Sequence, residues 1–134
     1  MYPFLLLQGG WGLLLLRVVF GAIMIVHGFP KLKDIKGTGA NFANMGFRPG
    51  ALWGTLVALL EPLGGLALIL GIMTVWVAAL FVVEFLVIIF WKIAKSSPFA
   101  GGWEFDLLLM TSAFVLFLFG AGIVSLDHFF FLGF

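Results

Sequence analysis

Four long apolar runs dominate this chain, and each has the length of one helical crossing of a lipid bilayer. They lie at about residues 11–29, 51–72, 75–91 and 103–124. A membrane-spanning helix needs about 20 mostly apolar residues. Transmembrane β-strands instead alternate apolar and polar residues over about 10 positions, and these runs do not alternate. The sequence therefore predicts an all-α fold, a bundle of four transmembrane helices.

The composition excludes several other classes of protein. Hydrophobic residues make up 63% of the chain and charged residues 10%, whereas a soluble domain carries about 25% charge. A net charge of +1 gives no basic face for a nucleic-acid partner. The chain has no cysteine, so it encodes no iron–sulfur or thiolate zinc site. With no linker visible, we expect one membrane domain over residues 1–134, with the lipid bilayer as its surroundings.

The basic residues predict how the chain is oriented. Loops at residues 31–50 and 92–102 follow the first and third runs, so both lie on one side of the membrane. They hold every basic residue outside the runs: Lys31, Lys33, Lys36, Arg48, Lys92 and Lys95. Cytoplasmic loops carry an excess of Lys and Arg. We therefore expect both loops in the cytoplasm and both termini outside, with a short interfacial helix near residues 39–45.

Three charged residues fall inside the apolar runs, namely Arg17, Glu61 and Glu84. A charge near the bilayer centre costs about 2.5–3.5 kcal/mol on insertion scales, so each should face the bundle or a wet cavity. Counting along the helices puts Arg17 roughly 9 Å and Glu61 roughly 16 Å from the same end. An Arg17–Glu61 pair is therefore the leading expected contact, with Arg17–Glu84 left open. One Arg against two Glu leaves an excess acid, and Glu84 is expected either to be protonated and bonded to a neighbouring helix or to serve as a ligand or proton site.

Small residues accompany these charges at helical spacing. One face of the second run carries Gly54, Ala58, Glu61 and Gly65, and one face of the first carries Arg17, Gly21, Met24 and Gly28. Stripes of small residues let membrane helices approach closely. We expect the two stripes to pack together. The charged pair between them would either bind a ligand or proton, or only fix the register of the two helices.

Further polar residues are expected near the two ends of the bundle. His27, Lys31 and Glu104 lie toward the basic loops, where they would bind an anionic headgroup, relay protons or form a solvated rim. Asp127 and His128 lie at the opposite end. Because the two histidines are at opposite ends, they do not form a haem site within one chain. No metal site is predicted.

An ordered series of short motifs resembles the DoxX family along nearly the whole chain. The motifs are LLRVVFG at residues 15–21, HGFPKL at 27–32, GFRP at 46–49, GG at 64–65, LGI at 70–72, WE at 103–104 and GAGIVSLD at 120–127. The resemblance implies a four-helix membrane bundle of a bacterial or archaeal cell membrane. The polar set that carries over is Arg17, His27, Lys31, Glu61, Glu104 and Asp127. Glu84 matches no family motif.

The resemblance also implies a function linked to redox chemistry. The family is named for its similarity to the membrane subunit of a thiosulfate:quinone oxidoreductase, which is also described as part of a terminal quinol oxidase. It implies a quinone-linked subunit or accessory protein, with quinone as cofactor and a redox subunit as partner. The sequence leaves open whether the chain itself catalyses a reaction. Two alternatives remain: a small homo-oligomeric transporter or proton-coupled carrier, and a membrane scaffold without catalysis.

Overall fold

The computed structural model describes the backbone of residues 2–130 and the side chains of residues 7–130. The helices are α1 (Tyr2–Lys33), α2 (Ile35–Asn44), α3 (Gly50–Leu70), α4 (Thr74–Ala94), α5 (Glu104–Phe119) and α6 (Leu126–Phe129), with a single wide turn, η1 (Phe99–Trp103), before α5. The described residues contain no strand. Four segments, Leu7–Lys33, Gly50–Leu70, Thr74–Ala94 and Phe99–Phe119, are long and apolar enough to cross a membrane. The predicted all-α fold with four transmembrane helices is confirmed.

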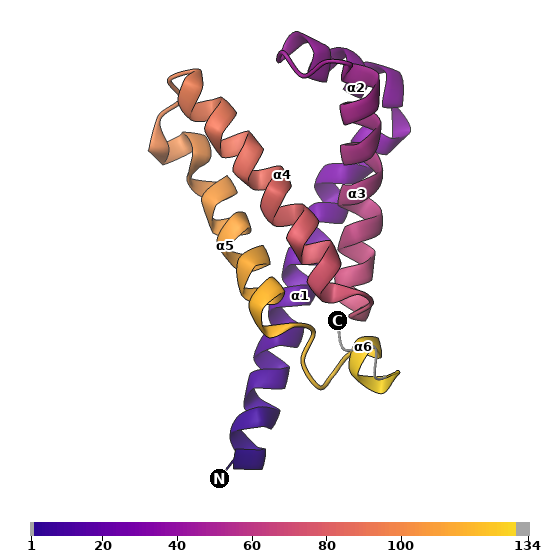
Figure 1. Cartoon of the computed structure of the whole chain (residues 1–134), viewed down its shortest axis with the longest axis vertical. Coiled ribbons are helices and arrows are strands. Elements are labelled where there is room, and N and C mark those ends of the chain that lie inside the picture. The colour runs from indigo at the N-terminus through magenta and orange to yellow at the C-terminus, as the bar shows by residue number, and fades with distance from the viewer. Residues whose placement is uncertain (1, 131–134) are drawn as a thin grey trace.

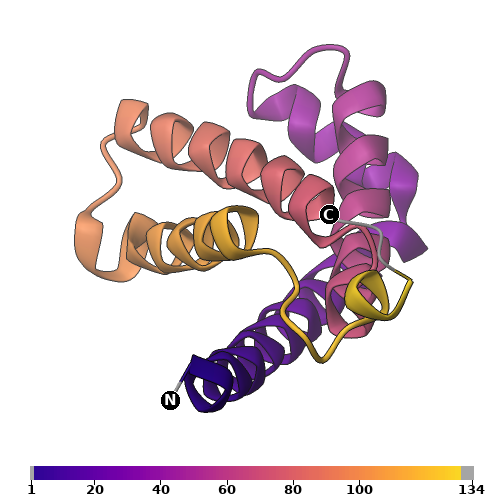
Figure 2. The same cartoon turned by 60° about the horizontal axis from the view of Figure 1, so that its bottom comes forward.

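The four long helices form two pairs, α1 with α3 and α4 with α5. The pairs meet near the turn between α3 and α4 and separate toward the end that carries α2 (Figure 1). Figure 2 shows the same splayed arrangement from another direction. We call the end with α2 and η1 the basic end and the end with α6 the opposite end. The separation of the pairs at the basic end creates the space described in the next subsection.

The α1–α3 pair is held by close backbone contact between glycines. A Cβ added to Gly65 would lie 2.6 Å from the carbonyl oxygen of Gly21, and one added to Gly28 would lie 2.5 Å from Cβ of Glu61. These distances leave no room for a side chain, so the small-residue stripes pack together as expected. The α2 helix adds a similar contact, because a Cβ on Gly54 would lie 2.8 Å from Cα of Gly39.

A core of buried side chains joins all four long helices where the two pairs meet. It contains Phe20, Met24, Leu68, Ala78, Phe81, Phe85, Leu109, Ala113 and Leu116. The rings of Phe20 and Phe81 pack edge to face, with centroids 5.2 Å apart, an arrangement that aromatic pairs favour. This core fills the space between the two helix pairs in the part of the bundle nearer the opposite end.

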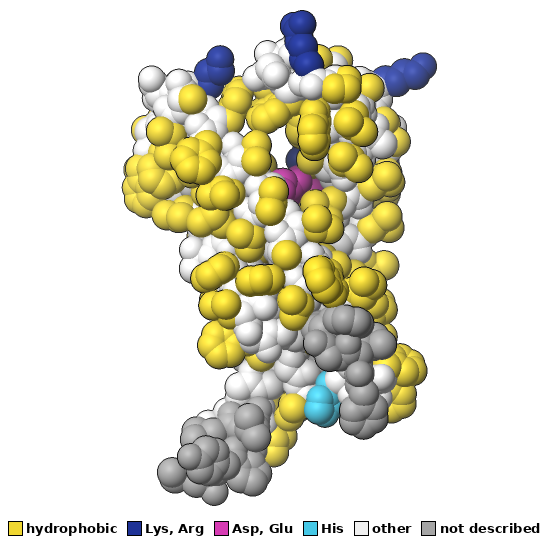
Figure 3. All heavy atoms as spheres, in the orientation of Figure 1, with side chains coloured by type: hydrophobic (Ala, Val, Ile, Leu, Met, Phe, Trp, Pro, Cys, Tyr) yellow, Lys and Arg dark blue, Asp and Glu magenta, His cyan; other side chains and the backbone are white. Residues whose placement is uncertain are grey.

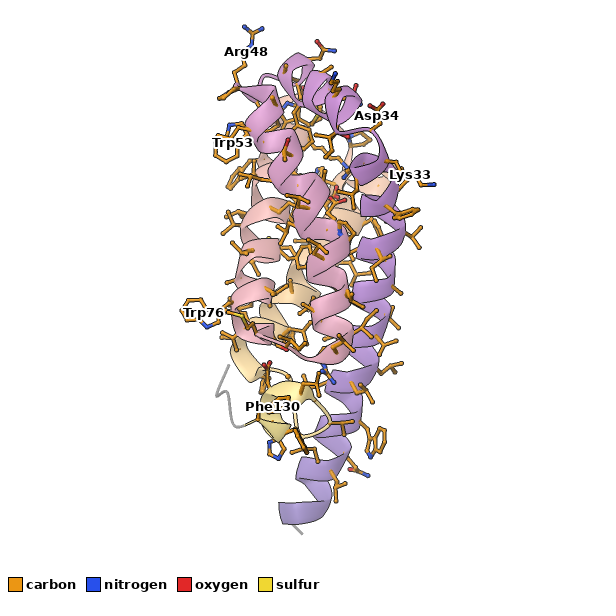
Figure 4. All side chains as sticks on the ribbon, turned by 90° about the vertical axis from the view of Figure 1, so that its right-hand side faces the viewer. Lys33, Asp34, Arg48, Trp53, Trp76 and Phe130 are labelled. Atoms are coloured by element: carbon orange, nitrogen blue, oxygen red, sulfur yellow. The ribbon has the colours of Figure 1, made fainter. Side chains whose placement is uncertain are left out.

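The outer surface is apolar along the length of the helices. Exposed side chains such as Leu63, Leu80 and Phe90 cover it, and Lys and Arg side chains project at the basic end (Figure 3). Trp53 and Trp76 point outward near the two ends of the apolar belt (Figure 4), where aromatic residues meet the membrane–water interface. The surface is that of a multi-pass membrane protein in a lipid bilayer.

Several helix ends differ from the sequence expectation. The first helix begins at Tyr2 rather than near residue 11, and α4 ends at Ala94 rather than near residue 91. The α1 helix continues through Pro30 to Lys33 rather than ending near residue 29, because a proline in the last turn removes only one backbone hydrogen bond. The last long helix, α5, ends at Phe119 rather than near Val124. Gly120 follows it with φ 74° and ψ −161°, a backbone conformation that glycine adopts far more readily than other residues.

The interfacial helix expected in the first basic loop is α2, and it is longer than the predicted segment. Asp34 caps its first turn, because the Gly37 N–H donates a 2.9 Å hydrogen bond to the Asp34 carboxylate. The helix therefore begins at Ile35 rather than near residue 39.

Candidate functional site

A cavity of about 650 Å³ lies between α3 and α4 at the basic end. Its walls are mostly apolar and aromatic, from residues Phe42, Met45, Phe47, Trp53, Leu56, Val57, Leu60, Leu80, Val83, Val87, Ile88 and Trp91. The polar and charged residues that line it are Lys31, Thr38, Asn41, Glu84, Lys92 and Asp106. Figure 3 looks into this hollow and shows acidic side chains at its floor. Binding sites for small molecules combine apolar walls with a few polar groups in this way.

The α2 helix covers the cavity at the basic end. The indole N–H of Trp91, at the end of α4, donates a 2.9 Å hydrogen bond to the carbonyl oxygen of Met45, which follows α2. The Thr38 hydroxyl donates to the carbonyl oxygens of Lys31 and Asp34 and so ties α2 to the end of α1. These bonds hold the cover to both helix pairs.

The polar centre of the cavity is an ion pair between α1 and α3. Nζ of Lys31 lies 2.7 Å and 2.9 Å from the two carboxylate oxygens of Glu61. Glu61 is 3% exposed, and the Lys31 side chain is 35% exposed. The ammonium therefore reaches down from the helix end to neutralise a carboxylate that the α1–α3 contact buries.

Glu84 of α4 lies beside this pair at the wall of the cavity. Its side chain is 9% exposed, and its surroundings include the Glu61 carboxyl and the Lys31 ammonium. Among the described residues, no donor reaches either of its carboxyl oxygens. The fold therefore places at the wall of the cavity an acid that no basic side chain neutralises, beside the Glu61 carboxyl of α3. A protonated Glu84 can donate to that carboxyl, so the expectation that Glu84 bonds to a neighbouring helix stays a prediction.

A second ion pair lines the same cavity and joins α4 to α5. Nζ of Lys92 lies 2.5 Å from the Asp106 carboxylate and 3.4 Å from the carbonyl oxygen of Gly102. Sequence pattern does not indicate this pair, because Lys92 bears only on the orientation of the chain and Asp106 belongs to no motif. A usable signal is that Lys92 lies near the end of α4 and Asp106 near the start of α5, on the two sides of the loop that joins these helices.

Arg17 pairs with neither Glu61 nor Glu84, and this corrects the leading expectation. Its guanidinium is fully buried at the opposite end, donates to the carbonyl oxygen of Val124 and is attracted by Asp127. The depth count failed because it took Trp11 as level with the end of the second run, whereas α1 runs past the end of α3 (Figure 1) and Arg17 lies beside Gly71, the residue that follows α3.

Asp127 caps the start of α4. Its carboxylate accepts hydrogen bonds from the backbone N–H groups of Met73 at 2.7 Å and Thr74 at 2.9 Å. Its own N–H donates to the carbonyl oxygen of Gly71 at 2.8 Å. Together with Arg17, Asp127 fastens the segment after α5 to the turn between α3 and α4. Both residues are therefore far from the cavity.

The remaining sequence candidates lie near the basic end but do not join the cavity. His27 is exposed, and its ring centroid lies 6.3 Å from that of Phe105. Glu104 is also exposed, and its carboxylate accepts a 2.9 Å hydrogen bond from the Gly101 N–H. The structure thus divides the candidates, with Lys31, Glu61 and Glu84 at the cavity and the others outside it.

The cavity lies mostly within the part of the chain that resembles known proteins. The family model described as DoxX matches residues 12–93. The chain is 34% identical over 122 residues to "Putative oxidoreductase CatD" of Bacillus subtilis (strain 168), a similarity that covers 91% of this chain and 89% of the relative. No solved structure matches the chain.

Proposed function

Since the chain belongs to the DoxX family, we propose that it is a redox-associated membrane subunit whose cavity binds a quinone. The observation that carries this proposal is the apolar cavity of about 650 Å³ with Lys31 and Glu84 on its wall. A quinone has a flat apolar ring and carbonyl oxygens that accept hydrogen bonds. Apolar walls suit the ring, and the Lys31 ammonium suits a carbonyl oxygen because Nζ carries three donors.

The position of the cavity supports a ligand that is dissolved in the bilayer. Side chains that line it on α3 and α4 are also exposed on the apolar surface, as with Leu56 at 50%, Leu80 at 55% and Val83 at 59%. The gap between the two helix pairs therefore opens sideways, toward lipid. A quinone with an apolar tail would enter along this path without crossing water.

Electrons would come from outside this chain. The chain has no cysteine to bind an iron–sulfur cluster. The relative's name, a putative oxidoreductase, supports redox chemistry in the family. We therefore propose a redox partner subunit at the membrane surface, with this chain supplying the quinone site.

A photoreactive quinone tests this proposal directly. An azidoquinone bound to the purified protein should label residues on the α3 and α4 walls of the cavity, and excess unlabelled quinone should prevent the labelling. Leu56→Trp fills the side of the cavity and should reduce labelling at least about fivefold. Leu66→Trp is the matched control, because Leu66 is 48% exposed on the same helix and does not line the cavity. Labelling spread over the apolar surface, or equal in both variants, would contradict quinone binding here.

A proton-coupled carrier is the weaker candidate. The cavity opens sideways toward lipid, and the core around Phe20, Phe81 and Phe85 closes the path to the opposite end. A carrier would have to separate the two helix pairs at this core. Quinone binding requires no such movement.

We also propose that residues 1–134 act as one membrane domain with its basic end in the cytoplasm. The absence of native cysteine allows single cysteines to report the orientation. In intact cells, a membrane-impermeant maleimide should label His128→Cys at once and Lys95→Cys only after the membrane is permeabilised. Both residues are exposed, so the reverse pattern would show the opposite orientation.

A further inference from the structure

Glu84 is the carboxyl group at the cavity that no basic side chain neutralises. Both of its carboxyl oxygens are buried, and no donor among the described residues reaches them. The two oxygens of Glu61, by contrast, are bonded to Lys31. The neighbour of Glu84 is the Glu61 carboxyl, which is itself an acid and cannot neutralise a second carboxylate. Buried polar side chains nearly always have a hydrogen-bond partner, and a ligand in the cavity would supply one for Glu84.

The charged groups around Glu84 come from the four long helices. Lys31 of α1 and Glu61 of α3 lie nearest and form a pair. Lys92 of α4 and Asp106 of α5 line the same space and form a second pair. Each ammonium is therefore matched by a carboxylate other than Glu84. Glu84 is the acid left in excess, and it can meet a ligand either as a carboxylate or as a protonated carboxyl group.

From this arrangement, and resting on the proposed quinone function, we infer that Glu84 binds a ring oxygen of the ligand and couples quinone binding to the uptake of one proton. A quinone carbonyl oxygen only accepts hydrogen bonds, so Glu84 must carry a proton to bond to it. At a pH where Glu84 is ionised in the free protein, binding takes one proton from water onto the Glu84 carboxylate, and the resulting O–H donates to the carbonyl oxygen. No electron moves and no bond to the ring forms in this step.

A hydroxyl-bearing ring should behave in the opposite way. Its O–H donates directly to the Glu84 carboxylate, so binding takes up no proton. The Lys31 ammonium has three N–H donors, and two of them bond to Glu61. The third can donate to the ring oxygen that binds Glu84. The cavity therefore distinguishes the oxidised from the reduced ring by the protonation state of one side chain.

The test compares an alkyl benzoquinone with a phenol that carries the same alkyl tail and resists oxidation. Binding to the purified wild-type protein is measured from mildly acidic to mildly alkaline pH. The Kd of the quinone should rise by up to tenfold per pH unit once Glu84 is ionised in the free protein, as proton linkage requires. The Kd of the phenol should not rise over the same range. A pH indicator in weak buffer should record close to one proton taken up per quinone bound at alkaline pH.

Glu84→Gln keeps the volume of the side chain and removes the titrating group. Its amide N–H can donate to a carbonyl without taking up a proton, so the pH dependence of quinone binding should disappear. The phenol should bind at least fivefold more weakly at alkaline pH, because an amide oxygen is a weaker acceptor than a carboxylate. Glu104→Gln is the matched control, since Glu104 is an exposed carboxylate outside the cavity, and it should keep the wild-type slope.

The outcomes separate this inference from the proposed function. Quinone labelling of the cavity together with a pH-independent Kd, or with equal slopes in wild type and Glu84→Gln, would overturn the coupling and leave quinone binding intact. Tighter binding of an alkyl amine than of either ring would also overturn it, because Glu84 would then be a cation site. If Glu84→Gln does not fold, the count of protons taken up by the wild-type protein decides alone, and a count near zero overturns the inference.

Discussion

Gly65→Leu should abolish the folded bundle, because it forces α1 away from α3. A Cβ at this position would lie 2.6 Å from the carbonyl oxygen of Gly21 and 3.2 Å from Cβ of Met24. The first of these atoms is backbone, so no side-chain rotation can relieve the contact. Overpacking a well-packed interior costs about 1–3 kcal/mol and sometimes more. We expect a loss of about that size for Gly65→Ala and no monodisperse protein for Gly65→Leu.

The measurement is the yield of monodisperse protein and the midpoint of its thermal unfolding in detergent. Gly12→Leu is the matched control, because it places the same side chain on α1 where nothing lies within 4 Å of an added Cβ. It should leave both quantities close to wild type. If Gly65→Leu and Gly12→Leu unfolded at the same temperature, close packing of the glycine stripes would not be what holds α1 to α3.

Helical periodicity was enough to predict this contact. Residues three or four apart lie on one face of a helix, so Gly21 and Gly28 on one helix and Gly65 on the other could be matched by spacing alone. The four long helices followed from hydropathy for a similar reason, since a bilayer accepts few structures other than helices that satisfy their own backbone. Both predictions depend on local pattern and not on where a helix begins.

The partner of each buried charge could not be predicted, because it depends on the ends of the helices. Lys31 seemed to belong to a loop after Pro30, yet α1 continues to Lys33 and carries its ammonium to Glu61. Arg17 seemed to lie near Glu61 in depth, yet α1 runs past the end of α3 and places Arg17 beside Gly71. A shift of a few residues at a helix end moves a side chain by several ångströms along the axis, which is enough to exchange one ion pair for another.

The cavity could not be predicted at all from the sequence. It exists because the α4–α5 pair separates from the α1–α3 pair at the basic end, and no local pattern specifies that separation. Glu84 shares its helix face with large apolar residues and matches no motif, so only the tertiary structure shows that it faces Glu61 and Lys31. The Lys92–Asp106 pair is a result of the same arrangement.

Lys31→Met should destabilise the protein strongly, because it removes the cation that neutralises Glu61. The Glu61 side chain is 3% exposed and both of its oxygens bond to Lys31. Removing one partner of a buried ion pair costs about 3–5 kcal/mol, since the remaining charge stays buried without compensation. The free energy of unfolding in mixed detergent should fall by about this amount. Lys33→Met should cost less than about 1 kcal/mol, because Lys33 is exposed and only its contact over the Phe29 ring is lost.

The double variant Lys31→Met with Glu61→Gln shows whether an uncompensated charge is the cause. An amide at position 61 carries no charge, so the double variant should recover most of the stability that Lys31→Met loses. The coupling energy between the two positions should then be a large share of the single-variant loss. If the double variant were as unstable as Lys31→Met, the lysine would act through the packing of its aliphatic chain beneath α2.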